Sequence, residues 1–177
     1  MKASLQTPSQ TVGPYFAYGL CPEQYGYPFQ SILEAQMVDP LQSTETITIS
    51  GKVYDGEGVI IPDAMLEIWQ NDGTHKLYGR CGTGTDPENR FIFHTIKPAA
   101  IAGQAPFLSV ILFMRGQLIH SYTRLYFSDE QTLNQSDALL STLPEDRRAT
   151  LIAQKTDRGY TFDIHMQGEK ETVFLDI

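Results

Sequence analysis

From Thr46 onward, apolar and polar residues alternate along the chain with a period of two. Successive side chains of a β-strand point to opposite faces, so this period predicts strands with one buried face. The first stretch is the clearest example, with an apolar face and a polar face: Ile47, Ile49, Gly51 and Val53 against Thr48, Ser50 and Lys52.

Further strand patterns follow at short intervals, at residues 65–69, 90–96, 107–114, 118–127, 160–166 and 173–177. The run 107–114 is almost continuously apolar, which predicts a central strand buried on both faces. Turn-forming residues such as those at 55–58 and 71–73 separate the stretches. Many short strands with turns between them are typical of a β-sandwich, so the predicted fold class is all-β.

One helical segment is expected to interrupt this pattern near residues 144–155. Pro144 and the acids after it suit the first turn of a helix, because proline loses no hydrogen bond there and acids favour the positive end of the helix dipole. Leu151 and Ile152 follow at helical spacing. We therefore expect one short helical insertion in a β-sandwich domain that spans residues 46–177.

Residues 1–45 differ from the rest of the chain. They contain five prolines and three glycines, which prevent long regular elements. They also contain aromatic residues at a frequency that disordered tails rarely reach: Tyr15, Phe16, Tyr18, Tyr25, Tyr27 and Phe29. The sequence therefore predicts an irregular aromatic N-terminal arm that packs on another surface, which we expect to belong to a partner chain.

Composition and charge limit the possible partners and the location. A chain of 177 residues can bury about 70% of its unfolded surface. The net charge of −8 argues against nucleic acid or an anionic membrane as partner, and an anionic substrate would need a local cation. No apolar run reaches the roughly 20 residues of a membrane span, and the N-terminus lacks the apolar core of a signal peptide. The expected location is the cytoplasm.

The residues with the most reactive side chains form no recognisable site. The histidines have none of the H-x-H, H-x-x-x-H or H-E-x-x-H spacings: His75, His94, His120 and His165. Cys21 and Cys81 are expected to be buried free thiols. The nine tyrosines could offer phenolates to ferric iron, but most tyrosines in a sandwich are packing residues. The residues alone thus predict a sandwich without an evident active site.

Several motifs, in order over nearly the whole chain, resemble one enzyme family. Residues 7–15, 51–56 with 62–64 and 67–70, and 95–98 are similar to motifs of the intradiol ring-cleaving dioxygenases. The remaining motifs resemble in particular the α chains of the two-chain members that cleave protocatechuate: residues 115–116, 123–127, 129–130, 162–164, 167–169 and 171–174.

This resemblance implies a β-sandwich in a two-chain enzyme. The family's ferric iron is held by two tyrosines and two histidines, all from a catalytic β chain that is paralogous to the α chain. The enzyme inserts both atoms of O₂ between the hydroxyl-bearing carbons of protocatechuate, which gives 3-carboxy-cis,cis-muconate. The resemblance implies that this chain has no catalytic residue and no metal ligand, and that Fe(III) belongs to its partner in an αβ hetero-oligomer.

The positions that correspond to the iron ligands carry other residues here. Phe107 and Ser109 stand at the two strand histidines, and residues 99–101 lack the tyrosine expected after Lys97-Pro98. The second ligand tyrosine would fall in the short loop between residues 70 and 79, where Tyr78 matches a packing aromatic of the family. The family's α chains usually have histidine where Phe107 stands, and the loops at 71–89 and 97–106 are shorter than usual.

The resemblance also implies which residues reach the partner's substrate pocket: Thr11, Gly13, Pro14, Tyr15 and Arg115. Protocatechuate carries a carboxylate, which an arginine or a phenol hydroxyl can bind. The plain alternatives are a solvated turn for Arg115, a tight turn for Gly13-Pro14 and arm packing for Tyr15.

Two other functions remain to be weighed against an enzyme subunit. A stand-alone binding or interaction module could keep the sandwich without dioxygenase activity. An independent iron enzyme that uses Tyr78 and remote histidines would need an unprecedented ligand set, so we disfavour it.

Overall fold

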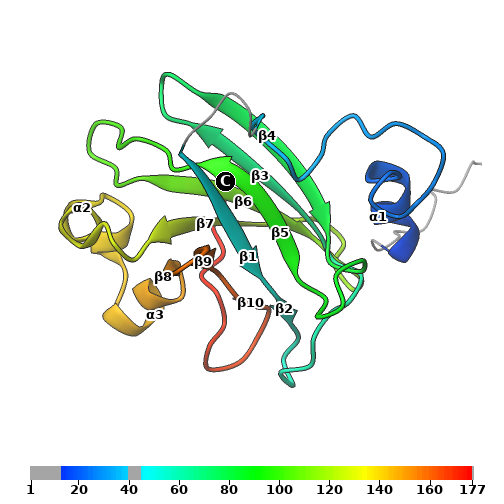
Figure 1. Cartoon of the computed structure of the whole chain (residues 1–177). Coiled ribbons are helices and arrows are strands. Elements are labelled where there is room, and N and C mark those ends of the chain that lie inside the picture. Colours follow the sequence, from blue (N-terminus) through cyan, green and yellow to red (C-terminus); the bar gives the residue numbers. More distant parts are fainter. Residues whose placement is uncertain (1–12, 40–44, 177) are drawn as a thin grey trace, which may run out of the picture.

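The computed structural model describes residues 13–39 and 45–176, and only the backbone of Pro14 and Tyr15. One helix precedes the strands, and the helices α2, η1 and α3 interrupt them (Figure 1). Among the described residues, no helix is long and apolar enough to cross a bilayer. The elements are α1 Pro14–Leu20, β1 Thr46–Gly51, β2 Val53–Tyr54, β3 Met65–Asn71, β4 Lys76–Gly82, β5 Phe91–Ile96, β6 Phe107–Phe113, β7 Ser121–Phe127, α2 Gln131–Ser136, the 3₁₀ helix η1 Leu140–Thr142, α3 Glu145–Ala149, β8 Ile152–Thr156, β9 Gly159–Thr161 and β10 Ile164–His165.

Eight strands form one sheet in the order β4-β3-β6-β7-β8-β9-β1-β5, and β10 pairs with β2 separately. Strand β8 pairs in parallel with β7 and antiparallel with β9, so it joins the two halves of the sheet. Figure 1 shows the half that contains β1 and β5 lying across the half that contains β3, β6 and β7. The fold is therefore a two-layer sandwich whose layers are continuous at β8.

Both layers supply the core between them. Strand β1 contributes Ile49 and strand β5 contributes Phe93, both completely buried. The facing layer contributes alternate residues of its strands: Leu66, Ile68, Leu108, Val110, Leu112, Leu125 and Phe127. Inward-facing residues from two packed sheets define a β-sandwich, so the predicted fold class is confirmed.

Strand β6 is buried differently from the prediction. Leu108, Val110 and Leu112 have 1% or less of their surface exposed, whereas Phe107 and Ser109 are half-buried. Only one face of the strand therefore lies in the sandwich core. The apolar residues on the other face are covered in part by neighbouring strands and by the arm, a tertiary effect that a local apolar run cannot reveal.

Several strand boundaries also differ from the prediction. The pattern did not predict β4, because this strand carries polar residues and two glycines. The strand expected at 118–127 begins at Ser121, and the one at 160–166 is divided between β9 and β10. Residues 173–176 belong to no strand in the described part of the chain, and Ile177 lies outside it.

The helical insertion is shorter than expected and lies beside a helix that was not predicted. Helix α3 ends at Ala149, and residues 152–156 form β8 instead of continuing it. Pairing of Ile152 with Tyr126 on β7 outweighs the local helical spacing, as tertiary context often does. Helix α2 was not predicted because its sequence has no apolar repeat at helical spacing.

The described part of the arm begins with a helix that packs on the sandwich of the same chain. Gly13 precedes α1, and Pro14 stands at its first turn, where proline suits a helix. Ala17 of the helix and Cys21, which follows its last residue, are buried against Met65 at the start of β3. Cys21 and Cys81 are buried free thiols, as expected.

Residues 34–37 of the arm connect the two end strands of the sheet. The carbonyl of Glu34 accepts a hydrogen bond from the Arg80 N–H of β4, at 3.1 Å. The Met37 N–H donates to the His94 carbonyl of β5, at 2.8 Å. We call residues 34–37 the strap. A Cβ on Gly79 would lie 2.5 Å from Met37 Cγ, so the strap can pack on β4 only because residue 79 is glycine. The arm segment thereby closes the open edge between β4 and β5.

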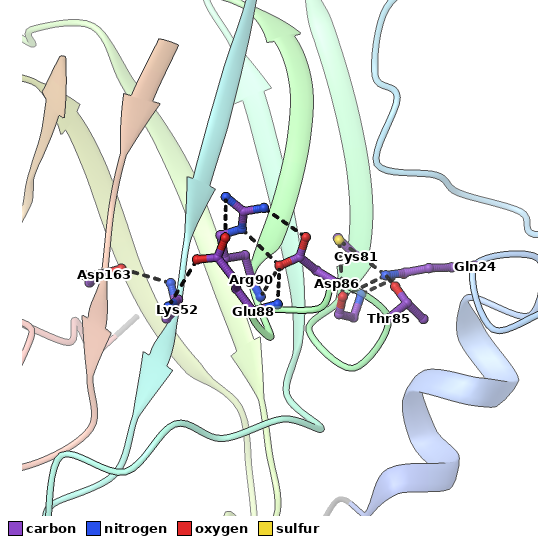
Figure 2. A network of polar contacts seen from close by, with 9 residues as sticks. Gln24, Lys52, Cys81, Thr85, Asp86, Glu88, Arg90 and Asp163 are labelled. Atoms are coloured by element: carbon purple, nitrogen blue, oxygen red, sulfur yellow. Dashed lines mark hydrogen bonds and ion pairs between the residues drawn. The ribbon is translucent and has the colours of Figure 1, made fainter. Parts of the chain in front are cut away.

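A second attachment lies at the end of β4. The Gln24 amide accepts a hydrogen bond from the Gly82 N–H and donates one to the Gly82 carbonyl, at 2.8 and 2.7 Å. It also donates to Thr85 Oγ1 at 2.8 Å. Figure 2 shows Gln24 reaching from the arm toward Cys81 and Thr85, beside the ion pair of Asp86 and Arg90.

Candidate functional site

Arg115 lies in the turn between β6 and β7, at the end of the sandwich that α1 covers. Its guanidinium binds Asp63, with Nε 3.0 and 2.9 Å from the two carboxylate oxygens and Nη2 2.7 Å from Oδ2. The Arg115 side chain is 61% exposed, whereas that of Asp63 is only 10% exposed. A carboxylate with little exposed surface thus holds one edge of an exposed guanidinium.

This ion pair fixes the charge of Arg115. The hydrogen bonds that Arg115 donates to the Asp63 carboxylate raise the pKa of the guanidinium above its ordinary value. Among the described residues no second acid pairs with Arg115. In a chain with a net charge of −8, the turn therefore presents a permanent cationic edge to the surroundings.

The structure brings the first residues of the arm helix to the same end as Arg115. The ring of Phe16 packs on Phe113, the last residue of β6, with ring centroids 5.4 Å apart. Gly13 caps the helix with extended backbone. The backbone of Pro14 and Tyr15 begins the helix, and Thr11 lies outside the described residues.

Exposed apolar residues surround this end. Leu118 and Ile119 follow Arg115 in the same turn and are 69% and 78% exposed. Phe16 is also exposed, at 39%. Clustered exposed apolar side chains are a mark of interaction surfaces.

A second region of interest is the outer face of β6, where Phe107 and Ser109 stand. The guanidinium of Arg124 lies over the Phe107 ring, 4.0 Å from its centroid. Arg124 also donates to the hydroxyl of Tyr126 at 3.3 Å. The Tyr122 hydroxyl donates to Ser109 Oγ at 2.9 Å. Cation–π packing and hydrogen bonds therefore fill this part of the face.

The loops beside this face are held by a buried carboxylate. Asp72 accepts hydrogen bonds from the N–H groups of Thr74, His75 and Ala99. Burial opposes its charge, but these hydrogen bonds outweigh it and keep the pKa of Asp72 well below its ordinary value. Asp72 thereby ties the loop after β3 to Ala99.

Tyr78 has the packing role expected for it. Its ring stacks on Trp69 at 3.9 Å between centroids, and its hydroxyl accepts a hydrogen bond from Arg80. Burial and the nearby carboxylate of Glu67 raise the pKa of Tyr78 to about 12.

The described residues include no group of three or more His, Cys, Asp or Glu side chains placed to hold a metal ion. Arg124 brings a positive charge to the face where Phe107 and Ser109 stand. These observations concern this chain alone.

Comparison with known proteins identifies the relatives of this chain. It is 44% identical to the protocatechuate 3,4-dioxygenase alpha chain of Burkholderia cepacia, over 97% of this chain and 98% of that one. It is 38% identical to the alpha chain of Pseudomonas putida, over 97% and 96%. The beta chain of Burkholderia cepacia is 29% identical over 72% of this chain and 67% of its own length. No protein-family model matches the chain.

Solved structures agree on the fold. The dioxygenase domain of a carbohydrate-binding fusion protein from Streptomyces sp. SirexAA-E superimposes with a TM-score of 0.56 and 20% identity, over 82% of this chain and 94% of that one. Catechol 1,2-dioxygenase from Acinetobacter sp. ADP1 superimposes with a TM-score of 0.54 and 14% identity, over 73% and 55%.

The sandwich thus has the fold of the intradiol dioxygenases. Sequence identity over almost the entire length narrows this class further. The chain belongs to the family of protocatechuate 3,4-dioxygenase alpha chains.

Some residues of the site did not emerge from the sequence as functional. In the sequence, Asp63 belongs only to the motif at 62–64, and nothing local pairs it with Arg115, which lies 52 positions away. Arg124 likewise belongs only to the motif at 123–127. Arg80 binds Glu67 at 2.7 Å and donates to the Leu20 carbonyl of α1 at 3.3 Å, a link that no spacing could indicate.

Proposed function

We propose that this chain is the non-catalytic alpha subunit of a heteromeric protocatechuate 3,4-dioxygenase. The enzyme would cleave protocatechuate with O₂ to 3-carboxy-cis,cis-muconate. The observation that carries the proposal is the 44% identity to a named alpha chain over 97% of this chain. The cytoplasmic location expected from the sequence stays a prediction.

Fe(III) is held, in this proposal, by a paralogous beta chain. A beta chain is a detectable relative of this one, so the two chains of such an enzyme share ancestry. The contacts of Phe107 with Arg124 and of Ser109 with Tyr122 support the assignment, because they leave no paired ligands on β6. The bound iron would supply the redox chemistry, and this chain would bind and orient.

The contribution of this chain is to form one wall of the partner's substrate pocket. Gly13 caps α1, Pro14 and Tyr15 begin it, and the helix packs beside the turn of Arg115. With Thr11, they are the residues that we propose to line the pocket. The cationic edge of Arg115 suits the carboxylate of an aromatic acid, since a guanidinium binds carboxylates through directed hydrogen bonds.

The arm of residues 1–45 would also contact the beta chain. Phe29 and Ile32 are 68% and 92% exposed, and they border a hollow of about 420 Å³ beside α1 and Arg80. Leaving such side chains in water is unfavourable, whereas permanent interfaces bury apolar and aromatic residues.

Co-expression with the homologous beta chain of the same organism tests the proposal. We expect a complex that co-purifies, contains one iron per αβ pair and consumes O₂ with protocatechuate. This chain alone should be colourless and inactive. Failure of the two chains to associate would favour a stand-alone interaction module, and stoichiometric iron in this chain alone would refute its non-catalytic role.

A further inference from the structure

The two members of the Arg115–Asp63 ion pair differ in exposure, since Arg115 is largely exposed and Asp63 is not. This difference indicates a role for Asp63. Arg115 uses Nε and Nη2 on the same carboxylate, at distances of 2.7 to 3.0 Å. A guanidinium has five N–H donors in a rigid plane. Within residues 13–39 and 45–176 no acceptor pairs with its Nη1 donors, which belong to a side chain that is 61% exposed.

Asp63 is the fixed member of the pair. The next residue, Ala64, is completely buried and its N–H donates to Thr83 Oγ1 at 3.1 Å. The Thr83 N–H donates back to the Ala64 carbonyl at 2.9 Å. These two bonds fasten the turn of Asp63 to the end of β4, so the carboxylate has a defined position from which to hold an arginine.

The backbone of Arg115 is held in a separate way. The side chain of Gln117 accepts a hydrogen bond from the Met114 N–H at 3.1 Å and donates to Ser121 Oγ at 2.5 Å. Gly116 has a φ of +84°, which allows the tight turn. The turn is thus closed independently of Asp63, and loss of the carboxylate would release the Arg115 side chain without opening the turn.

We propose that Asp63 is a positioning residue for substrate recognition, which holds one edge of Arg115 so that the opposite edge faces the carboxylate of an aromatic acid in the partner's pocket. The inference rests on the proposed function and adds a residue to it. A long arginine side chain loses rotamer freedom when it binds, and holding it in advance removes part of that loss. Asp63 also neutralises one positive charge, so recognition depends on the direction of hydrogen bonds more than on net charge.

Asp63→Ala in the assembled αβ enzyme tests this inference. We expect KM for protocatechuate to rise about five- to twentyfold with kcat changed less than about twofold, since the contact is remote from the ring carbons that react. Catechol, which has no carboxylate, should be bound as before. Asp63→Asn keeps an acceptor for Nε and should give a smaller rise. Glu88→Ala, which removes an exposed carboxylate ion-paired elsewhere, is the matched control and should change neither constant.

A double variant separates positioning from a structural role. In the Arg115→Ala background, Asp63→Ala should cause no further rise in KM, because the residue it acts through is gone. An equal rise in both backgrounds would mean that Asp63 supports the fold, and no rise in either would also overturn the inference. If Arg115→Ala itself leaves protocatechuate binding unchanged, the role of Arg115 is wrong and the inference fails with it. A complex without iron would instead contradict the proposed function.

Discussion

Arg124 lies over the ring of Phe107, with its guanidinium carbon 4.0 Å from the ring centroid. The contact stands on the outer face of β6, where the resemblance to intradiol dioxygenases would have placed a histidine ligand. A cation packed on an aromatic ring is a stable arrangement, and a positive charge there disfavours a ferric ion. A packing contact therefore occupies this face of β6.

The first prediction follows from that packing contact. The isolated chain should contain no stoichiometric iron and show no visible absorption of a phenolate–iron complex. Restoring two histidines by Phe107→His and Ser109→His should leave both results unchanged, since Arg124 and the missing tyrosines still oppose ferric iron. Elemental analysis and absorption spectra of both proteins check this, and a coloured double variant would contradict it.

The second prediction concerns the exposed apolar residues of the arm. Ile32→Asp should weaken or abolish co-purification with the beta chain, because it places a charge in a proposed apolar interface. Ile32 is 92% exposed, so the stability of the isolated chain should change by less than about 0.5 kcal/mol.

Val59→Asp is the matched control for this test. Val59 is also exposed, at 57%, but lies in the turn before β3 and outside the arm. Its substitution should leave assembly intact. Equal loss of assembly in both variants, or none in either, would show that the arm does not make the contact we propose.

The third prediction tests the strap that closes the sheet. Gly79→Ala would place a Cβ 2.5 Å from Met37 Cγ and 2.9 Å from the Glu34 carbonyl oxygen. Overpacking of this kind lowers the free energy of unfolding by about 1–3 kcal/mol. Gly19→Ala is the control, since nothing lies within 4 Å of its Cβ position and alanine favours a helix. Urea denaturation of both variants should show a lower midpoint for the Gly79 variant alone.

How well the sequence predicts a structural feature depends on how far apart in the chain the interacting residues lie. The alternation around Ile49 is local, and so the strand and its buried face were predicted correctly. The link between Asp63 and Arg115 spans 52 positions, so it emerges only when β3 and β6 are paired. Strand β8 and the strap at residues 34–37 depend in the same way on partners far along the chain.

The candidate site was predicted unevenly for the same reason. Residue motifs located Arg115 and the start of α1, and the fold places both at one end of the sandwich. Whether they line a partner's pocket is a property of the complex and stays a prediction.

The fourth prediction concerns acid stability. Hydrogen bonds from Arg90 lower the pKa of Asp86 from its ordinary value of 3.8 to about 2. A carboxyl with a depressed pKa in the folded state stabilises the fold above the ordinary pKa, and this stabilisation is lost as the pH falls through the lower value. The unfolding free energy should therefore decline between about pH 4 and pH 2.

Asp86→Asn should flatten part of that decline, because the carboxyl that titrates is gone. Asp157→Asn, at an exposed position in the turn between β8 and β9, serves as the control. Urea unfolding at several pH values gives the two slopes. If the Asp86 variant keeps the full slope of the wild-type chain, the contact with Arg90 does not carry the effect.

The last prediction compares Arg115 with Tyr15 in the assembled enzyme. Arg115→Ala should lower kcat/KM for protocatechuate by about ten- to a hundredfold, as expected when a charged partner is removed from a substrate contact. Tyr15→Phe keeps the ring and loses one hydroxyl, so its effect should match one net hydrogen bond of about 1 kcal/mol, or roughly fivefold. Iron content should stay at the wild-type level in both variants, because neither residue is proposed as a ligand.

The comparison of protocatechuate with catechol shows whether Arg115 recognises the substrate or holds the assembly together. If Arg115 binds the carboxylate, protocatechuate should lose far more than catechol, whereas equal losses on both would mean that Arg115 holds the two chains together.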